Sequence, residues 1–246
     1  MGLLDRYKQI NERIAEAAIK SRREPRDITM IAVTKSASPE AIRQVLEWGH
    51  YDLGESRVQQ LQQRAAQVEE WLHRAAGRTE KKLPKSGRGD GCVRWHMIGH
   101  LQRNKVRPVM GIAESIHSID SLRLAEEIQE EATRAGRIMP AFLEVNVAGE
   151  SSKFGVAVGA AVHLAEQIDT MDAVQLVGLM CMAPYSSNPE NARPHFVRLR
   201  EIYEEIRFRK IGGEKCRHLS MGMSGDYQVA IEEGATIVRI GTALFG

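Results

Sequence analysis

Apolar positions in this chain follow two spacings that alternate from one end to the other. A helical spacing comes first and predicts an N-terminal helix, with apolar residues at Leu3, Leu4, Tyr7, Ile10, Ile14, Ala17 and Ala18. Next comes ITMIAVTK (28–35), which is too short for a helix and nearly apolar throughout, as a buried parallel strand is. Ser38, Pro39 and Glu40 then have the order of an N-cap, a first helical residue and a first-turn acid, and Gly49 closes the predicted helix.

The same order of strand and then helix continues to the end of the chain. Further strands are expected at 52–55, 94–99, 114–120, 140–147, 174–183, 216–222 and 235–246, and helices at 57–74, 102–110, 122–136, 159–171, 189–209 and 225–233. Strict alternation predicts a parallel sheet with right-handed crossovers. About eight such units favour a closed barrel over an open doubly wound sheet, which usually has fewer strands. We therefore predict one (β/α)₈ TIM barrel over residues 1–246, with an extra N-terminal helix.

One segment interrupts this rhythm. Residues 77–91 (GRTEKKLPKSGRGDG) carry five Lys or Arg residues, four glycines and a proline, with almost nothing apolar. This composition predicts a flexible surface insertion. Its basic charge could attract phosphates or nucleic acid, but no aromatic residues are interleaved for base stacking. A solvated loop is the favoured interpretation.

Composition narrows the class of protein. The 246 residues have a formal net charge of only +2, which gives no general drive toward nucleic acid or anionic membranes. Aromatic residues make up 5%, so the core is expected to be aliphatic. The three cysteines (Cys92, Cys181 and Cys216) share no metal-binding or redox spacing, which favours reduced thiols. The chain shows neither a secretory signal nor a transmembrane run, so we expect a soluble cytoplasmic protein.

The candidate chemistry starts at Lys35, directly after the first strand. In (β/α)₈ barrels the active site lies at the carboxyl ends of the strands. A lysine in an apolar, partly dry barrel mouth loses stabilisation of its charged form, and its free amine can then form a Schiff base. A merely solvated lysine is the ordinary alternative.

Two later turns have the features of a phosphate site. Residues 220–226 (SMGMSGD) place two hydroxyls and two glycines just before a helix, and Gly241 and Thr242 follow the last strand. Phosphate sites in these barrels are commonly built from the loops after strands seven and eight. A lysine facing such a site suits a phosphorylated carbonyl compound, which is either pyridoxal phosphate (PLP) or the sugar phosphate of a Schiff-base aldolase.

A metal site is not favoured. His96 and His100 are four residues apart, but they fall on a strand and its following loop rather than on one helical face. No nearby carboxylate completes a ligand set.

Several ordered motifs resemble the pyridoxal phosphate homeostasis protein family, and the match spans nearly the whole chain. They are AVTK (32–35), GESRVQQ (54–60), WHMIGHLQRNK (95–105), HSID (117–120), EVN with ESSKFGV (144–156), GLMCMAP (178–184), HLSMGMSGD (218–226) and VRIGTALFG (238–246). The resemblance implies a barrel similar to the N-terminal domain of alanine racemases, with PLP as cofactor. Ser56 departs from the family pattern, because an asparagine is common there.

The resemblance also implies roles for single residues. Lys35 would hold PLP as a Schiff base, and no other residue is expected to be catalytic. The phosphate would be bound by Ser220, Ser224, Gly241 and Thr242. Arg239 would face the pyridine nitrogen, and the pocket would be lined by Asn146, His96 and Met180.

Arg239 bears on what such a site does. A permanent cation beside the pyridine nitrogen disfavours its protonation and weakens the ring as an electron sink. The second domain that gives alanine racemases their opposite base is not expected here. We therefore expect a protein that carries or buffers PLP, plausibly as a monomer, and supplies apo-enzymes; an amino-acid racemase of low activity is the alternative.

Overall fold

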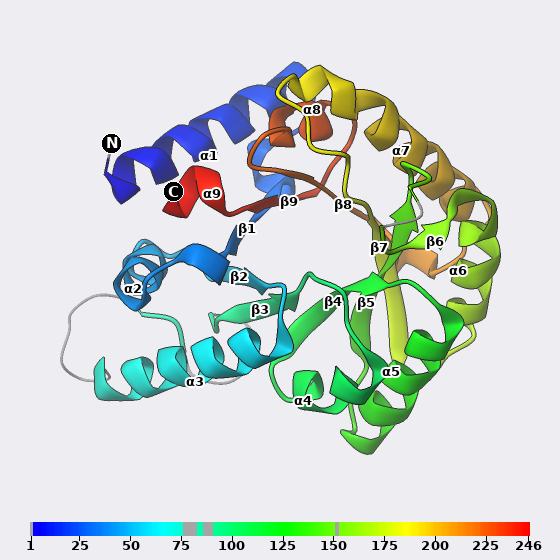
Figure 1. The fold of residues 1–246 in the computed structure, drawn as a ribbon, viewed down its shortest axis with the longest axis horizontal. Coiled ribbons are helices and arrows are strands. Elements are labelled where there is room, and N and C mark those ends of the chain that lie inside the picture. The colour runs from blue at the N-terminus through cyan, green and yellow to red at the C-terminus, as the bar shows by residue number, and fades with distance from the viewer. Residues whose placement is uncertain (1, 76–82, 86–90, 151–152) are drawn as a thin grey trace.

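The computed structural model describes residues 2–75, 83–85, 91–150 and 153–246. Its strands are β1 (Thr29–Val33), β2 (Asp52–Glu55), β3 (Arg94–Met97), β4 (Ala113–Ile119), β5 (Met139–Asn146), β6 (Val156–Ala157), β7 (Val174–Met180), β8 (His218–Met223) and β9 (Ile237–Ile240). Each pairing between them is parallel. The order β4-β3-β2-β1-β9-β8-β7-β5, with β4 also paired to β5, closes a ring (Figure 1). The predicted (β/α)₈ barrel is confirmed.

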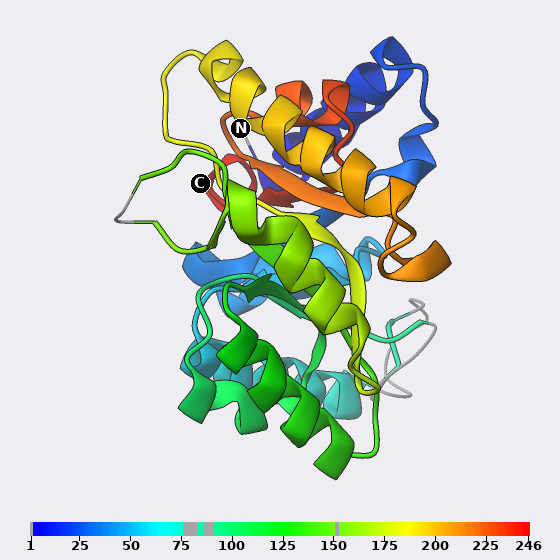
Figure 2. The same ribbon diagram turned by 90° about the vertical axis from the view of Figure 1, so that its right-hand side faces the viewer.

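Helices cover the outside of this ring, as both views show (Figures 1 and 2). They are α1 (Leu3–Lys20), α2 (Pro39–Glu47), α3 (Val58–Ala75), α4 (Val106–Met110), α5 (Leu122–Arg134), α6 (Ala161–Asp169), α7 (Arg193–Phe208), α8 (Tyr227–Glu232) and α9 (Thr242–Phe245). The extra N-terminal helix α1 packs against α8 and α9, so both ends of the chain lie together (Figure 1). In the part of the chain that the structure describes, no helix has the length and apolar character needed to span a membrane.

Local signals in the sequence account for several helix ends. The Ser38 hydroxyl accepts a hydrogen bond from the Ala41 amide at 3.2 Å, and Pro39 begins α2. Gly49, after the end of α2, has a φ of +86°, which favours glycine. In α1, Ile10, Ile14 and both alanines of the predicted stripe are buried.

Two features differ from the sequence-based expectation. The last strand ends at Ile240 rather than at the chain end, and α9 follows it. The backbone leaves the strand conformation at Gly241 (φ −114°, ψ −84°). The Ser224 hydroxyl accepts hydrogen bonds from the Gly241 and Ala243 amides. The short strand β6, paired to β5, was not predicted.

The predicted insertion at 77–91 lies mostly outside the described residues. Within it, Leu83 packs against the main core and Lys85 forms an isolated bridge with Cys92. The prediction of a flexible surface loop for the rest of this segment is not tested.

The core has two layers of different character. A large aliphatic layer fills the space between the strands and the surrounding helices. A smaller apolar cluster lies inside the ring and contains Ile31, Val33, Ile98, Phe142, Met180 and Ile237. Buried polar side chains share the interior with it, among them His96, Ser115, His117, Ser220 and Arg239.

Gly178 lies at a close backbone contact between strands β7 and β8. It pairs with His218 across β7 and β8, and a Cβ at Gly178 would overlap the His218 carbonyl. Both are backbone positions of paired strands, so the overlap is relieved only by parting them. We expect Gly178→Ala to lower the free energy of unfolding by at least about 2 kcal/mol in denaturant titrations.

Gly111→Ala is the matched control. A Cβ at Gly111 meets no atom of the described part of the chain within 4 Å, and the backbone there has an ordinary φ of −74°. Its unfolding free energy should change by no more than about 0.5 kcal/mol. Equal losses in the two variants would contradict this account of the β7–β8 contact.

Candidate functional site

A cavity of about 370 Å³ opens where the carboxyl ends of the strands meet the following loops. Lys35, Ser56 and Ile98 contribute to its wall from the segments after β1, β2 and β3. On the opposite side it is lined by Met182, Tyr185, Ser186, Met223, Ser224, Gly225, Asp226, Arg239, Gly241 and Thr242. Five residues named from the sequence, Lys35, Arg239, Ser224, Gly241 and Thr242, therefore meet around one space.

Lys35 lies in a 3₁₀ turn, Thr34–Ser36, that directly follows β1. The preceding residue anchors this turn, because the Thr34 hydroxyl donates to Glu55 Oε1 at 2.5 Å. Arg64 Nε lies 3.0 Å from the same oxygen. Lys35 itself is exposed at the cavity wall, so its surroundings are less dry than the sequence suggested.

Glu55 is fully buried at the end of β2. Burial raises its pKa, while Thr34 and Arg64 favour the charged form and act in the opposite direction. The sequence indicated only a strand-end acid; its contact with the lysine turn depends on the register between β1 and β2.

The turns after β8 and β9 are tied together by one hydroxyl. Ser224 Oγ accepts from the Gly241 amide at 3.2 Å and from the Ala243 amide at 3.1 Å. Asp226 Oδ1 accepts from the Met223 amide at 2.6 Å, which closes the first turn. These three amides are used within the protein, and their bonds shape a rim beside the cavity that carries the Ser224 and Thr242 hydroxyls.

Arg239 projects from β9 into the barrel and is 4% exposed. Its Nη1 donates to both the carbonyl and the hydroxyl of Ser220 at 2.7 Å, and its Nη2 donates to the Cys181 carbonyl at 2.8 Å. Burial lowers the pKa of Arg239, although a guanidinium remains charged in proteins. The cavity therefore has a fixed cation in its floor.

Four residues expected at the pocket are not among its lining residues. Ser220 is fully buried, and its hydroxyl is used by Arg239 and His117. His96 and Met180 lie deeper inside the ring. Asn146 Nδ2 donates to the carbonyls of Glu150 and Lys153 and so holds the loop after β5. These positions favour supporting roles over direct contact with a ligand.

Glu144 is a buried acid that the sequence analysis did not single out. It lies in β5, is 2% exposed and is electrostatically coupled to Arg239. Burial raises its pKa to about 7, against the opposing attraction of Arg239. A charged residue within an otherwise apolar strand was the available signal.

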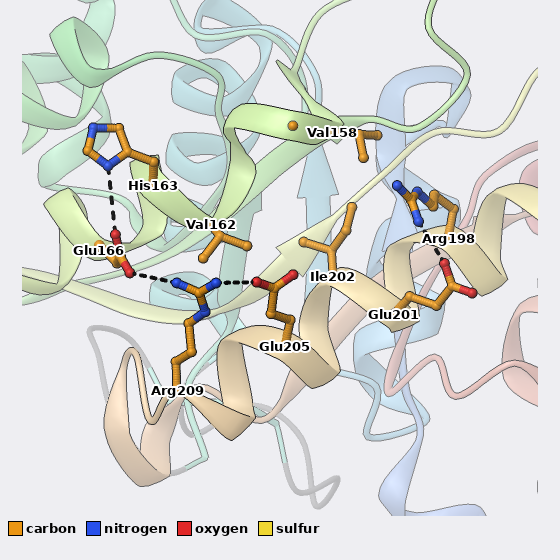
Figure 3. A pocket seen from close by; sticks show the side chains of 10 residues that line it. Val158, Val162, His163, Glu166, Arg198, Glu201, Ile202, Glu205 and Arg209 are labelled. Carbon is orange, nitrogen blue, oxygen red and sulfur yellow. Dashed lines mark hydrogen bonds and ion pairs between the residues drawn. The ribbon is translucent and has the colours of Figure 1, made fainter.

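A second cavity of similar size, about 390 Å³, lies outside the barrel between α6 and α7 (Figure 3). Its charged side chains neutralise one another. Arg209 bonds Glu205 at 2.6 Å and Glu166 at 3.3 Å, and Arg198 bonds Glu201 at 2.9 Å. The described residues that line this groove include no lysine, serine, threonine or cysteine, so the barrel mouth is the better candidate for Schiff-base chemistry.

Metal ligation has no support among the described residues, which contain no group of three or more His, Cys, Asp or Glu side chains able to hold an ion. His96 and His100 face different carboxylates: His96 Nε2 lies 3.1 Å from Asp52, and His100 Nδ1 lies 3.1 Å from Asp120.

Comparison with known proteins places this barrel in a family. The family model for the alanine racemase N-terminal domain matches residues 13–246. The pyridoxal phosphate homeostasis protein of Aquifex aeolicus is 37% identical over 246 residues, covering 100% of this chain and 98% of its own length. The protein of the same name from Pseudomonas aeruginosa is 34% identical over 97% of this chain and 92% of its own length. The chain belongs to the pyridoxal phosphate homeostasis protein family.

Solved structures agree with this membership. PipY of Synechococcus elongatus, solved with PLP bound, is 31% identical with a TM-score of 0.74 and covers 95% of this chain and 100% of its own. An alanine racemase of Clostridium difficile has a TM-score of 0.66 at 14% identity, and only 59% of its chain is covered, so it shows the shared barrel alone. This homeostasis-family barrel thus corresponds to one part of the racemase.

Glu144 makes the stability of the barrel depend on pH. Its pKa of about 7 exceeds the ordinary 4.5, so the folded state binds the proton more tightly than the unfolded state. The stability gained from the protonated acid is complete below about pH 4.5 and is lost as the pH rises through 7. We expect Glu144→Gln to remove a fall of about 3 kcal/mol between pH 4.5 and 8, measured by denaturant unfolding.

Glu126→Gln, at an exposed position of α5, is the control and should keep the pH profile of the unaltered chain. If Glu144→Gln and the unaltered chain lose stability in parallel over this range, Glu144 is not the titrating group.

Proposed function

We propose that this protein binds PLP at the barrel mouth as a Schiff base on Lys35, and that it carries or buffers the cofactor. The observation that carries the proposal is the single cavity in which the Lys35 amine, the Arg239 guanidinium and the two tied turns meet. PipY, a relative at 31% identity, has been solved with PLP bound.

The residues present fit PLP at each end of the cofactor. Lys35 offers a primary amine for the aldehyde. Ser224, Gly225 and Thr242 offer hydroxyl and backbone donors for the phosphate, and Gly241, whose own amide donates to Ser224, allows a close approach of the backbone. We leave Ser220 out of the phosphate contacts, because its hydroxyl is already bonded to Arg239 and His117.

Arg239 favours a carrier over an efficient enzyme. When bound, PLP supplies an electron sink that stabilises negative charge at a substrate carbon, and this sink is strongest when the pyridine nitrogen is protonated. A buried guanidinium beside that nitrogen disfavours the extra proton. Such a site binds the aldehyde but gives little stabilisation to negative charge at a substrate carbon.

A slow amino-acid racemase is the alternative function. Tyr185 lines the cavity and has a hydroxyl that exchanges protons, but it is 96% exposed and has no hydrogen bond among the described residues. An acid–base group needs a fixed position near the reacting carbon. This arrangement supports low activity at most.

We infer that the protein works in the cytoplasm as a monomer, with apo-enzymes as its partners. Cys181 and Cys216 are buried thiols without a disulfide, which suits a reducing compartment.

The covalent attachment has a direct test. Full-length protein incubated with PLP should become yellow, and borohydride reduction followed by peptide mass spectrometry should place the adduct on Lys35. Lys35→Ala should lose the visible band, because the amine is absent. Lys105→Ala, at an exposed lysine after β3, should keep it. An adduct found only on another residue would overturn the assignment.

Direct delivery is tested by mixing the PLP-loaded protein with an apo-enzyme in the presence of an excess aldehyde trap. A carrier reactivates the enzyme despite the trap, since the cofactor does not pass through bulk solution. Free PLP at the same concentration is the control and should fail. Delivery abolished by the trap would contradict direct transfer.

The same loaded protein separates carrier from racemase. With L-alanine in D₂O, exchange of the α-proton should stay below about 1 s⁻¹, the low end for ordinary enzymes. Faster exchange would favour the racemase.

A further inference from the structure

A column of polar side chains crosses the interior of the barrel. It begins at the floor of the candidate site and ends at the amino end of β2, and its members in order are Arg239, Ser220, His117, Ser115, His96 and Asp52. The proposed function uses only the first of them. The rest lie on β2, β3, β4 and β8, and their role is open; Asp52 is partly buried and the others are buried.

Each neighbouring pair is within hydrogen-bond distance. Arg239 Nη1 lies 2.7 Å from Ser220 Oγ, which lies 2.9 Å from His117 Nδ1. His117 Nε2 lies 2.9 Å from Ser115 Oγ, and that oxygen lies 2.8 Å from His96 Nδ1. His96 Nε2 is 3.1 Å from Asp52 Oδ1 and completes the column.

The two ends of the column have fixed and opposite characters. Arg239 can only donate hydrogen bonds. Asp52 can only accept while it is ionised. Burial alone would raise the pKa of Asp52, but hydrogen bonds from His96 and Arg94 outweigh burial and hold the pKa well below its ordinary value. Arg94 also binds both oxygens of this carboxylate.

When both histidines are neutral, the fixed ends determine the direction of every bond between them. Five contacts need five protons. Arg239 supplies one, and each serine and each neutral histidine supplies one more. All contacts are satisfied only when every group donates toward Asp52. A histidine protonated on Nδ1 alone would place two donors or two acceptors face to face.

We propose that His96 and His117 are both neutral Nε2–H tautomers in a one-directional hydrogen-bond relay, and that His117 and Ser220 are positioning residues for Arg239. In this arrangement Arg239 donates to Ser220, Ser220 to His117, His117 to Ser115, Ser115 to His96, and His96 to Asp52. This chain of hydrogen bonds holds the guanidinium on the side away from the cavity. The direction of its bonds cannot reverse without a net gain or loss of a proton.

Packing around His117 supports this assignment. The ring is fully buried and stacks on Phe142 with centroids 4.1 Å apart, so it cannot turn over freely. Burial, together with repulsion from the permanent charge of Arg239, lowers its pKa well below the ordinary value and keeps the ring neutral. A neutral ring with both nitrogens in contact must choose one tautomer.

The relay belongs to the chain itself, and its effect on the pyridine ring rests on the proposed function. A guanidinium that shifts or tilts changes the field at the pyridine nitrogen and hence the proton affinity of the bound cofactor. The relay thus gives His117 a part in tuning PLP although it does not touch the cavity.

The first test needs no cofactor. Long-range ¹H–¹⁵N correlation spectra of the full-length protein at neutral pH report the tautomer of each histidine, and His96→Gln and His117→Gln assign the signals by their loss. We expect both rings as neutral Nε2–H. An Nδ1–H tautomer or an imidazolium at His117 overturns the relay, whether or not the protein binds PLP.

The second test breaks the relay at its centre. Ser115→Ala removes the bridging oxygen, so His117 should change from one tautomer to a mixture of two. In the PLP-loaded protein, the pH midpoint of the visible band should move by about 0.5–1 unit, the equivalent of one net hydrogen bond.

Ser118→Ala is the matched control, because Ser118 is also buried in β4 but its hydroxyl has no hydrogen-bond partner among the described residues. It should change neither the tautomer nor the midpoint. It leaves in place the other titratable groups near the column, namely Glu144 and Asp226 beside Arg239 and His218 near His117. Equal shifts in both variants refute the relay, whereas a protein that takes up no PLP but keeps both tautomers refutes only the proposed function.

Discussion

A permanent positive charge inside the barrel is the constraint on which the rest of this structure depends. Arg239 is 4% exposed, and a guanidinium in such a place is costly unless its donors are satisfied. The carbonyls of Ser220 and Cys181 accept from it directly. Glu144 adds a nearby acid whose raised pKa shows that burial outweighs the attraction. Polar groups surround Arg239 in the interior because its hydrogen-bond donors have to be satisfied.

The barrel separates the groups that hold this charge from those that face a ligand. The apolar cluster around Phe142 and Met180 and the column from Ser220 to Asp52 fill the ring. Lys35, Ser224 and Thr242 lie above them on turns at the carboxyl ends of the strands. A packed interior fixes its side chains, while turns have room to admit a molecule and release it. This division suits a protein that must hold a reactive aldehyde and later give it up.

The sequence predicted the parts of this structure that depend on local order along the chain. Alternating strands and helices indicated the barrel, and the capping order at Ser38 placed the start of α2. Lys35 and the two turns were found because strand ends converge at one face of a barrel. The sequence did not predict how deep Ser220, His96 and Met180 lie in the barrel. Strands buried on both faces show no alternation of polar and apolar residues that would tell inward-pointing from outward-pointing side chains. Which way such a side chain points depends on how its strand pairs with its neighbours. The same holds for Glu144 and for the contact between Thr34 and Glu55.

The same constraint bears on why this fold would store PLP rather than turn over substrates. Catalysis at an α-carbon needs groups that change protonation state beside the reacting atom. In the interior of this barrel, each serine and histidine of the column has both of its contacts filled by neighbours. A proton added to the column would have to be taken up by Asp52, whose pKa is held well below its ordinary value, and one removed would leave a buried gap. Apart from Glu144, whose pKa is raised to about 7, proton exchange near the cavity therefore falls to the rim, where Lys35 and Tyr185 are exposed. A rigid charge below a solvent-accessible amine favours reversible capture of an aldehyde over repeated carbanion chemistry.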